Sequence, residues 1–429
     1  MKKRSATIGT ICWLLLSVGT AGADATGELR QQLEADLTVL QGLVGLEETE
    51  LRQALESRMT DRLDARTLTR RAFGSYVERS LADYDRALRP KDLRQLVTIS
   101  EEQLAATCRR RAFADLAAHL RGGVREIRLQ GVQAEADTGT AYLEVDLSSG
   151  PVPAVSTWSR SEDAWRLVDL EVNGQRLSHR LRELAGEAVT RELSLPVVVA
   201  RLTGSEYIVL EDFTTTPPGK PPVGWSLIWK DKDEGKPRHY LVQEANGKRY
   251  LEARDEGSSV IIGKFMRWNP REYPIMTWCW RTTVLPEGAD ERRNELNDSA
   301  GGIFVVFSFN WLLHTPKQLK YVWSTTLPVG TVDRRNKPLR PWFFVVESGG
   351  ERLGRWTFEQ VDLLRDYQLK LGDQPAERTV SIQVLTDANS THSRAAADYA
   401  DLRVWRRDAA ERGLIHDYCD CLEAGPTRP

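Results

Sequence analysis

The amino-acid pattern changes near residue 200, and this change constrains the fold more than any other feature of the chain. Between Leu29 and about Gly122, apolar residues recur near the helical period of about 3.6 residues, and strand-like alternation follows up to Val172. After Tyr207, short apolar runs are separated by Gly, Pro and Asn, and ten of the 13 tryptophans lie in this part. We therefore expect an α+β N-terminal domain, with helices over a four-stranded antiparallel sheet, followed by an all-β sandwich of jelly-roll-like type.

The expected elements follow from these two patterns. In the first part they are four strands and a closing helix, at Val124–Val132, Thr140–Leu147, Val152–Ser159, Trp165–Val172 and Leu177–Glu192. In the second part they are strands at Tyr207–Leu210, Tyr240–Gln243, Tyr250–Ala253, Val260–Lys264, Ile275–Val284, Ile303–Phe309, Lys320–Thr326, Trp342–Glu347, Val380–Leu385 and Asp401–Trp405. One helical insert is expected at Phe358–Leu371, and Pro90 lies just before a further helix.

The first residues have the three parts of an export signal. Lys2–Arg4 is basic, Ile8–Val18 is apolar, and the small residues of Ala21–Ala25 offer two cleavage points. A membrane anchor is the alternative, but a spanning helix needs about 20 apolar residues and this run has roughly half as many. We therefore expect an exported protein with a signal peptide at 1–25 and no transmembrane segment after its cleavage.

Charge and cysteine content set further bounds. The net charge of −2 gives no general attraction to nucleic acid, and we expect no nucleic-acid partner. Once the signal is removed, four cysteines remain: Cys108, Cys279, Cys419 and Cys421. An oxidising compartment permits disulfides, but four cysteines allow three pairings and the sequence does not choose among them. Cys419 and Cys421 are interpreted as a terminal cysteine pair rather than a metal or redox site, because no C-x-x-C or histidine spacing surrounds them.

Two segments of the first part resemble the MlaC-type, or toluene-tolerance, family of periplasmic phospholipid shuttles. They are Asp64–Tyr76 and Trp165–Leu177, the second with a tryptophan-led strand, an aspartate and a turn glycine before a helix. The match spans roughly residues 28–200, although Leu177-Ser178 replaces a serine–leucine pair and Ser156–Arg160 is more polar than in the family. The resemblance implies a periplasmic lipid-carrier domain at 26–200 that encloses the acyl chains of a phospholipid. It also implies a partner in an envelope lipid-transport complex.

A lipid carrier needs an apolar lining, because each methylene gains about 0.8 kcal/mol on leaving water. On this resemblance we expect lipid contacts from eight residues: Phe73, Tyr76, Val77, Leu96, Leu104, Leu143, Val145 and Leu170. The alternative for each is an ordinary core position. Arg70-Arg71 is a candidate for the phosphate, although such a pair is more often a solvated helix face.

The second part, about residues 207–407, resembles a bacterial family known only as domain of unknown function 3047. The resemblance lies in Trp278–Arg281, Asn297-Asp298, Lys320–Trp323, Thr386–Thr391 and Asp398–Leu402. Members often carry aspartate where Asn297 stands and a further aspartate where Ala388 stands, and both departures weaken an argument for an acidic site. We expect this β-sandwich domain of unknown function to span 201–410, followed by a polar tail at 411–429.

Candidate ligand residues in the second part are aromatic and acidic. Trp278 and Trp280 share one face of a strand, because alternate residues do. If exposed, they would form a glycan or ligand face together with Trp323, but a buried aromatic core is the favoured alternative. Asp298 and Asp387 are the two carboxylates that we expect to meet in space if the domain cleaves a sugar bond.

Three further carboxylates suggest a metal. Glu211 and Asp212 near the first strand, and Asp401 on the last, resemble the carboxylates with which many sandwich modules hold a structural Ca²⁺. This calcium ion is the one cofactor for which the sequence gives a hypothesis.

Motifs of known enzyme classes do not occur in the sequence: G-x-S-x-G, H-E-x-x-H and G-x-G-x-x-G are absent, and the six histidines lack ligand spacing. The sequence therefore favours a binding protein over an enzyme. The main hypothesis is a periplasmic phospholipid-binding and transport protein, fused to a β-sandwich binding module, that acts in envelope lipid trafficking. The alternative is a glycan-binding or glycan-cleaving sandwich with the N-terminal domain as its docking module.

Overall fold

The computed structural model describes residues 8–121, 123–161, 164–230, 239–310, 315–335, 340–419 and 422, with side chains from residue 24 onward except at 229, 230 and 310. The basic start of the expected export signal, and Cys421, lie outside the described residues. The chain divides into two compact units. Unit 1 comprises Met1–Ser75 and Glu101–Gly186, and unit 2 comprises Tyr76–Ser100 and Glu187–Pro429.

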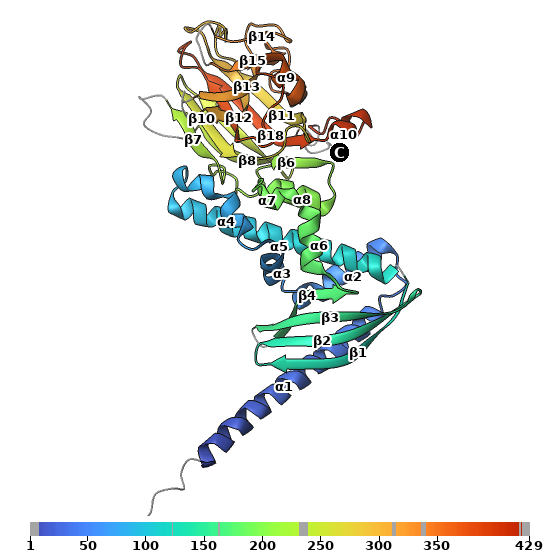
Figure 1. The fold of residues 1–429 in the computed structure, drawn as a ribbon. Helices are drawn as coiled ribbons and strands as arrows, with labels where there is room; N and C mark the ends of the chain where they lie inside the picture. The colour runs from blue at the N-terminus through green and yellow to red at the C-terminus, as the bar shows by residue number, and fades with distance from the viewer. Residues whose placement is uncertain are drawn as a thin grey trace, which may run out of the picture. The chain divides into compact units, whose positions relative to one another are not determined.

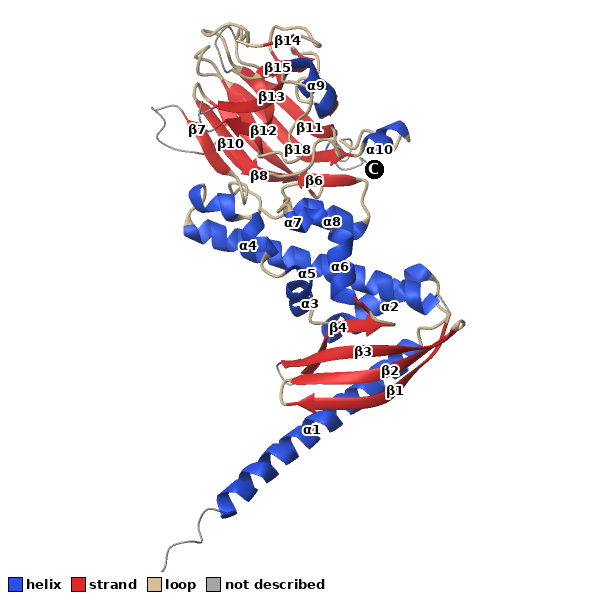
Figure 2. Cartoon of the chain, in the orientation of Figure 1, coloured by secondary structure: helices blue, strands red, loops and turns tan. Residues whose placement is uncertain are grey.

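Unit 1 consists of one antiparallel sheet and several helices (Figures 1 and 2). The sheet order is β1-β2-β3-β4-β5, with bounds Val124–Glu135, Thr138–Leu147, Gly150–Ser161, Ala164–Val172 and Gln175–Arg176. The helices are α1 (Ile8–Gln41), α2 (Glu48–Met59), η1 (Thr60–Arg62), α3 (Ala65–Phe73), the part of α5 (Pro90–Arg121) after Ser100, and α6 (Leu177–Ala185). The expected four strands are present with helices beside them, and the expected α+β fold is confirmed.

Polar contacts fix where two helices of unit 1 begin. Asp64 caps α3, because its carboxylate accepts hydrogen bonds from the Thr67 backbone N–H at 3.0 Å and hydroxyl at 2.7 Å. Asp169 on β4 accepts from the Ser178 hydroxyl at 2.6 Å, which ties the start of α6 to the sheet. The predicted helix Leu177–Glu192 is interrupted, because Gly186 takes a positive φ of 54° and ends α6.

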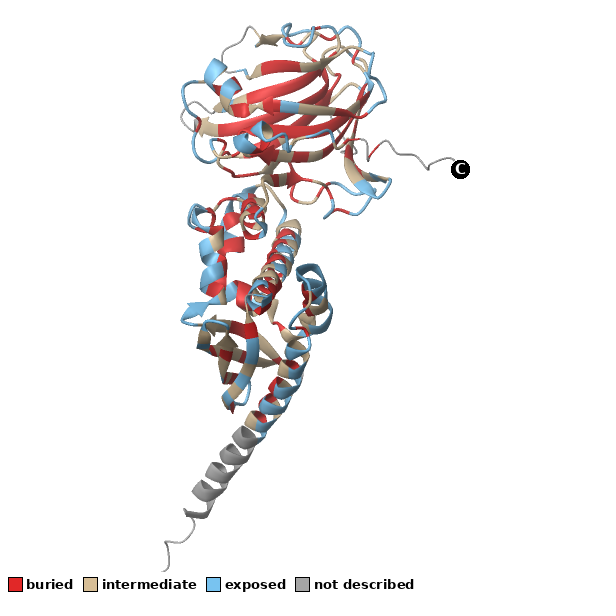
Figure 3. Ribbon diagram, turned by 90° about the vertical axis from the view of Figure 1, so that its right-hand side faces the viewer, coloured by how far each residue is buried: buried red, intermediate tan, exposed pale blue. Residues whose placement is uncertain are grey.

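Unit 2 contains a β-sandwich, as the sequence predicts. One sheet has the order β14-β15-β13-β12-β17-β10-β7, and the other has β16-β11-β18-β9-β8 with β6 beside β18. The strands are β6 (Tyr207–Glu211), β7 (Ser226–Lys230), β8 (Tyr240–Ala245), β9 (Lys248–Asp255), β10 (Ser259–Phe265), β11 (Ile275–Val284), β12 (Ser299–Asn310), β13 (Thr315–Ser324), β14 (Val332–Asp333), β15 (Trp342–Ser348), β16 (Thr357–Asp362), β17 (Ser381–Asp387) and β18 (Ala395–Trp405). Figure 3 shows that residues of the sandwich strands are mostly buried, which places the core between the two sheets.

Short helices complete unit 2. Besides the first residues of α5, they are α4 (Tyr76–Ser80), η2 (Ala82–Arg86), α7 (Glu187–Thr190), α8 (Leu195–Thr203), α9 (Leu363–Lys370) and α10 (Arg407–Glu411). Among the helices that the structure describes in either unit, none is long and apolar enough to cross a membrane.

Three predictions for the sandwich need correction. The helix predicted over Phe358–Leu371 is a strand in its first half, β16, which pairs with β11, and only α9 is helical. Strand β18 begins at Ala395 rather than at Asp401, because the alanines at its start carry no strand signal of their own and are fixed by pairing with β9. Strands β7 and β14 are additional; β14 has two residues, too few for a sequence pattern.

A disulfide joins Cys279 on β11 to Cys419 in the tail. Cys419 therefore does not pair with Cys421, and the structure supplies the pairing that the sequence left open. The tail also contributes Tyr418 and Leu422 to the apolar cluster around this disulfide, so part of the expected polar tail packs on the sandwich. Cys108 in unit 1 is a buried free thiol, and burial raises its pKa to about 11.

Candidate functional site

The sheet of unit 1 has one charged face and one apolar face. On the charged face, Arg128 of β1 pairs with Glu144 of β2 at 2.7 Å, and Tyr142 of β2 is exposed. The apolar face carries the alternate residues of β2, which are Gly139, Ala141, Leu143, Val145 and Leu147. Alternation of this kind assigns the apolar side to the interior of the unit.

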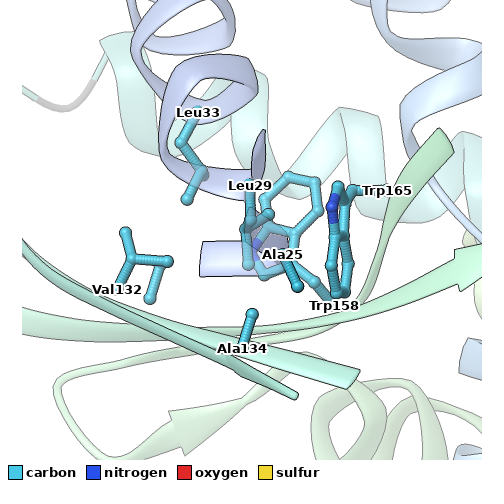
Figure 4. Packing of buried hydrophobic residues seen from close by; sticks show 8 residues of the cluster. Ala25, Leu29, Leu33, Val132, Ala134, Trp158 and Trp165 are labelled. Carbon is cyan, nitrogen blue, oxygen red and sulfur yellow. The ribbon is translucent and has the colours of Figure 1, made fainter. Parts of the chain in front are cut away.

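Helix α1 closes one end of the apolar face (Figure 4). Its Leu29 and Leu33 lie one helical turn apart and are 0% and 3% exposed. They belong to a single cluster with small residues of the sheet and two indoles: Ala25, Val132, Ala134, Ala141, Trp158 and Trp165. Gln32 Nε2 of α1 also donates to the backbone oxygen of Trp165 at 2.8 Å, which fixes the helix against β4.

Beyond this cluster the same face carries buried residues, such as Val145 and Ala154, beside aliphatic residues that are only half-buried. Its half-buried aliphatic residues on β2, β3 and β4 beyond the α1 cluster are Leu143, Leu147, Val152, Leu170 and Val172, which we call the open apolar face. The strand register places them on one side, because Val145 pairs with Val152, Leu143 with Ala154, and Ala154 with Val172. Aliphatic side chains gathered in this way form a surface that an apolar ligand can cover.

Five of the eight predicted lipid contacts lie in unit 1. Leu143, Val145 and Leu170 are on the apolar face of the sheet. Phe73 on α3 and Leu104 on α5 are buried among the helices of the same unit. The candidate phosphate pair, Arg70-Arg71, is exposed on α3, as expected for a solvated helix face.

The other three predicted contacts, Tyr76, Val77 and Leu96, belong to unit 2. Tyr76 donates its hydroxyl to the backbone oxygen of Leu193, and the Leu96 side chain lies beside Gly224. These three are therefore core residues of the unit that holds the sandwich. Helical periodicity shows which residues are buried but not which unit they are buried in.

The three candidate tryptophans are inside the sandwich. Trp278, Trp280 and Trp323 are all 0% exposed, and the Trp280 ring lies 5.5 Å from Trp278 and 5.7 Å from Trp323. Trp280 Nε1 donates to Glu359 at 3.2 Å, and burial raises the pKa of Glu359 to about 8. The glycan-face hypothesis for these indoles is corrected accordingly, because a ring buried on all sides offers no surface for stacking on a sugar.

A charged cluster surrounds Lys320 on β13, and we call it the Lys320 cluster. The Lys320 ammonium donates to the Ser299 hydroxyl at 2.9 Å, and the Ser299 backbone N–H donates to Asp387 at 2.9 Å. Ser299 and Ser324 donate their hydroxyls to the two carboxylate oxygens of Glu291, at 3.2 and 2.7 Å. All five side chains are buried, so the cluster links β12, β13, β17 and the loop before β12.

Burial governs the protonation of the Lys320 cluster. It raises the pKa of Asp387 to about 7, an effect that the nearby Asp298 carboxylate strengthens and the Lys320 ammonium opposes. It also raises the pKa of Glu291 and lowers the pKa of Lys320. All members of the cluster are buried, so none is open to a large substrate.

Asp298 directly precedes Ser299 of this cluster in the chain, and its charge contributes to the raised pKa of Asp387. Asp298 is completely buried, however, and accepts hydrogen bonds from the backbone N–H groups of Ser390 and Thr391, at 3.1 and 2.7 Å, and from the Thr391 hydroxyl at 2.7 Å. Its oxygens hold a loop rather than face a ligand.

Each of the three candidate calcium ligands is a carboxylate that already forms hydrogen bonds or an ion pair within the protein. Glu211 accepts from Lys264 Nζ at 2.8 Å, and also from Trp225 Nε1. Asp212 accepts from its own turn, and Asp401 pairs with Arg403 at 2.6 Å. Within the described ranges, no group of three or more His, Cys, Asp or Glu residues is placed to hold a metal ion. These residues do not fit a calcium site.

Lys320, Glu291 and Ser299 are site residues that sequence reasoning missed. Lys320 stands in a segment that carries the family resemblance, which is the signal that would have pointed to it. Glu291 lies in a loop rich in charged residues, and nothing in the local sequence marks it as buried.

The sandwich matches a known protein family. Residues 225–403 match the family model described as Protein of unknown function (DUF3047). The matched range includes Trp278, Asp298, Lys320 and Asp387. Among curated proteins, none matches the chain.

Several solved structures are similar to parts of the chain. One is a phospholipid-binding protein from Ralstonia solanacearum in complex with a phospholipid, at 17% identity over 42% of this chain and 95% of that chain, with a TM-score of 0.30. A family 11 carbohydrate-binding module from Clostridium thermocellum has 8% identity over 47% and 95% of the two chains and a TM-score of 0.26. A xyloglucanase domain from Sinorhizobium fredii has 10% identity over 45% and 99%, also with a TM-score of 0.26. All three TM-scores are below 0.5.

Proposed function

We propose that the protein is an exported phospholipid carrier in which unit 1 binds the acyl chains. The observation that carries the proposal is the open apolar face, which stays half-buried beside the end that α1 closes. Apolar area left in water costs about 25 cal/mol per Å², and a bound acyl chain removes that cost for itself and for the sheet.

Two sequence features support this proposal. The segments Asp64–Tyr76 and Trp165–Leu177 resemble those of MlaC-type carriers, and the chain starts with the pattern of an export signal. An acyl chain of sixteen carbons resists transfer into water by about 12 kcal/mol, at about 0.8 kcal/mol per methylene. A protein that carries such chains between two membranes must shield them, and the proposed location is therefore the periplasm.

The sandwich is proposed as a binding module that acts with the carrier in envelope lipid trafficking. The glycan alternative has less support, since its three tryptophans are buried and Asp298 is fully engaged in hydrogen bonds. A glycan array with the purified full chain tests that alternative directly. Clear binding of a defined oligosaccharide would favour the glycan alternative for unit 2.

The lipid proposal is tested with the full chain purified from the periplasm of a bacterium that expresses it. Native mass spectrometry and lipid extraction should detect phospholipid bound to the wild-type protein. Leu143→Glu places a charge on the open apolar face and should abolish the bound lipid. Tyr142→Glu is the matched control, because the neighbouring side chain is exposed on the opposite face and its replacement should leave lipid binding unchanged.

Circular dichroism of each variant establishes that it is folded before lipid is measured. A wild-type protein that carries no lipid and takes none from phosphatidylethanolamine–phosphatidylglycerol vesicles would refute the proposal. Equal lipid content in folded Leu143→Glu and Tyr142→Glu would show that the open apolar face is not the binding surface.

A further inference from the structure

Leu29 fills a space that a glycine leaves in the sheet. Gly139 on β2 has no side chain, and a Cβ atom placed there would collide with the Leu29 side chain. The same atom would lie 3.4 Å from the Trp165 ring and 3.5 Å from the Ala134 Cβ. Leu29 therefore occupies a notch walled by the indole and the sheet, and Figure 4 shows it in the cluster that contains Trp158 and Trp165.

This notch lies on the same side of β2 as the open apolar face. Gly139, Ala141 and Leu143 are alternate residues of one strand, so their side chains point the same way. From Ala141 to Leu147 the strand advances about 20 Å, at about 3.4 Å per residue. An acyl chain that lies along β2 on the open apolar face ends at Ala141, directly before Leu29.

Helix α1 is held firmly enough to act as a stop. The Thr26 hydroxyl accepts from the Ala134 backbone N–H at 3.1 Å, Glu28 pairs with Arg160 at 2.9 Å, and Arg62 pairs with Asp36 at 3.1 Å. These contacts reach β1, β3 and η1. The helix is thus tied to unit 1 on both sides of Leu29, in addition to the bond from Gln32 to β4.

We propose that Leu29 determines which phospholipids the protein binds, by setting how far their acyl chains extend along the sheet. This inference rests on the proposed lipid-binding function. Chains that end before Leu29 are bound completely, whereas longer chains leave methylenes outside the site. The site is thereby selective for phospholipids by chain length, and the selectivity resides in one side chain of α1.

The test compares chain-length preference in full-length wild-type protein and in Leu29→Ala. Each protein is offered an equimolar mixture of phosphatidylcholines with saturated chains of ten to eighteen carbons, and native mass spectrometry measures which are bound. Each further methylene buried raises affinity about fourfold, so the vacated space should increase the preference for longer chains roughly tenfold or more. Gln31→Ala, on the exposed side of the same helix, should keep the wild-type preference.

The outcomes separate this inference from the proposed function. A wild-type protein that binds no lipid refutes the proposed function, and the inference falls with it. A wild-type protein that binds lipid, with an unchanged preference in folded Leu29→Ala, refutes the inference alone. Should Leu29→Ala not fold, Leu29→Val decides the matter, because it shortens the same side chain by one carbon and should shift the preference in the same direction by about fourfold.

Discussion

Replacement of Asp387 by asparagine tests the electrostatics of the Lys320 cluster. Burial raises the pKa of Asp387 from 3.8 to about 7, and the side chain is only 3% exposed. Because the folded-state pKa is above the unfolded value, the folded protein holds one extra proton between about pH 4 and pH 7. The free energy of unfolding therefore falls as the pH rises through this window. The pKa differs by about three between the folded and unfolded states, and at about 1.36 kcal/mol for each pKa unit this lowers the free energy of unfolding by about 4 kcal/mol.

Asparagine keeps the shape of the side chain and the oxygen that accepts from the Ser299 backbone N–H, but it does not titrate. Asp387→Asn should match the wild type near pH 4 and become more stable than it by up to about 4 kcal/mol at pH 8.

Urea unfolding followed by tryptophan fluorescence at about pH 5, 6, 7 and 8 measures this difference. The signal reports mainly on unit 2, which holds most of the tryptophans. Asp373→Asn, at an exposed position of the same unit, is the control and should keep the wild-type pH dependence. The reasoning is refuted if Asp387→Asn and the wild type change with pH in parallel.

Three further changes have expected outcomes in the same unfolding assay. Asp298→Ala leaves two backbone N–H groups and a hydroxyl without an acceptor and should lower the free energy of unfolding by about 3–5 kcal/mol. Asp298→Asn should lower it clearly less, and equal losses in the two variants would contradict the hydrogen-bond argument. Cys419→Ser opens a disulfide that spans 140 residues and should lower the free energy of unfolding by about 2–5 kcal/mol. Dithiothreitol should lower the urea midpoint of the wild type but not that of the variant. Trp323→Ala empties a fully buried position and should cost about 3–5 kcal/mol; a variant with unchanged stability would show that this indole is not part of the core.

Local patterns were sufficient for much of the secondary structure. Alternation located the four long strands of unit 1, and Pro90 marked the start of α5. The pattern failed where pairing overrides propensity: β16 was hidden within a helical pattern, and the alanine-rich start of β18 is a strand because β9 and β11 lie beside it. Burial of the tryptophans agrees with the alternative that the sequence favoured, but only the packing of two sheets decides which face of β11 is interior.

The open apolar face, on which the proposed function depends, lies in the first half of the chain. The sequence by itself determined that β2 has an apolar side, because residues two apart on a strand share a face. It could not determine how much of that side is covered, since the cover comes from Leu29 and Leu33 of α1, more than a hundred residues earlier in the chain than Gly139. The same holds for the Lys320 cluster, whose members lie on separate strands and a loop. Tertiary structure alone decided that Leu29 closes one end of the sheet and that Lys320, Asp387 and Glu291 share one buried network, because contacts between distant segments leave no periodic trace in the sequence.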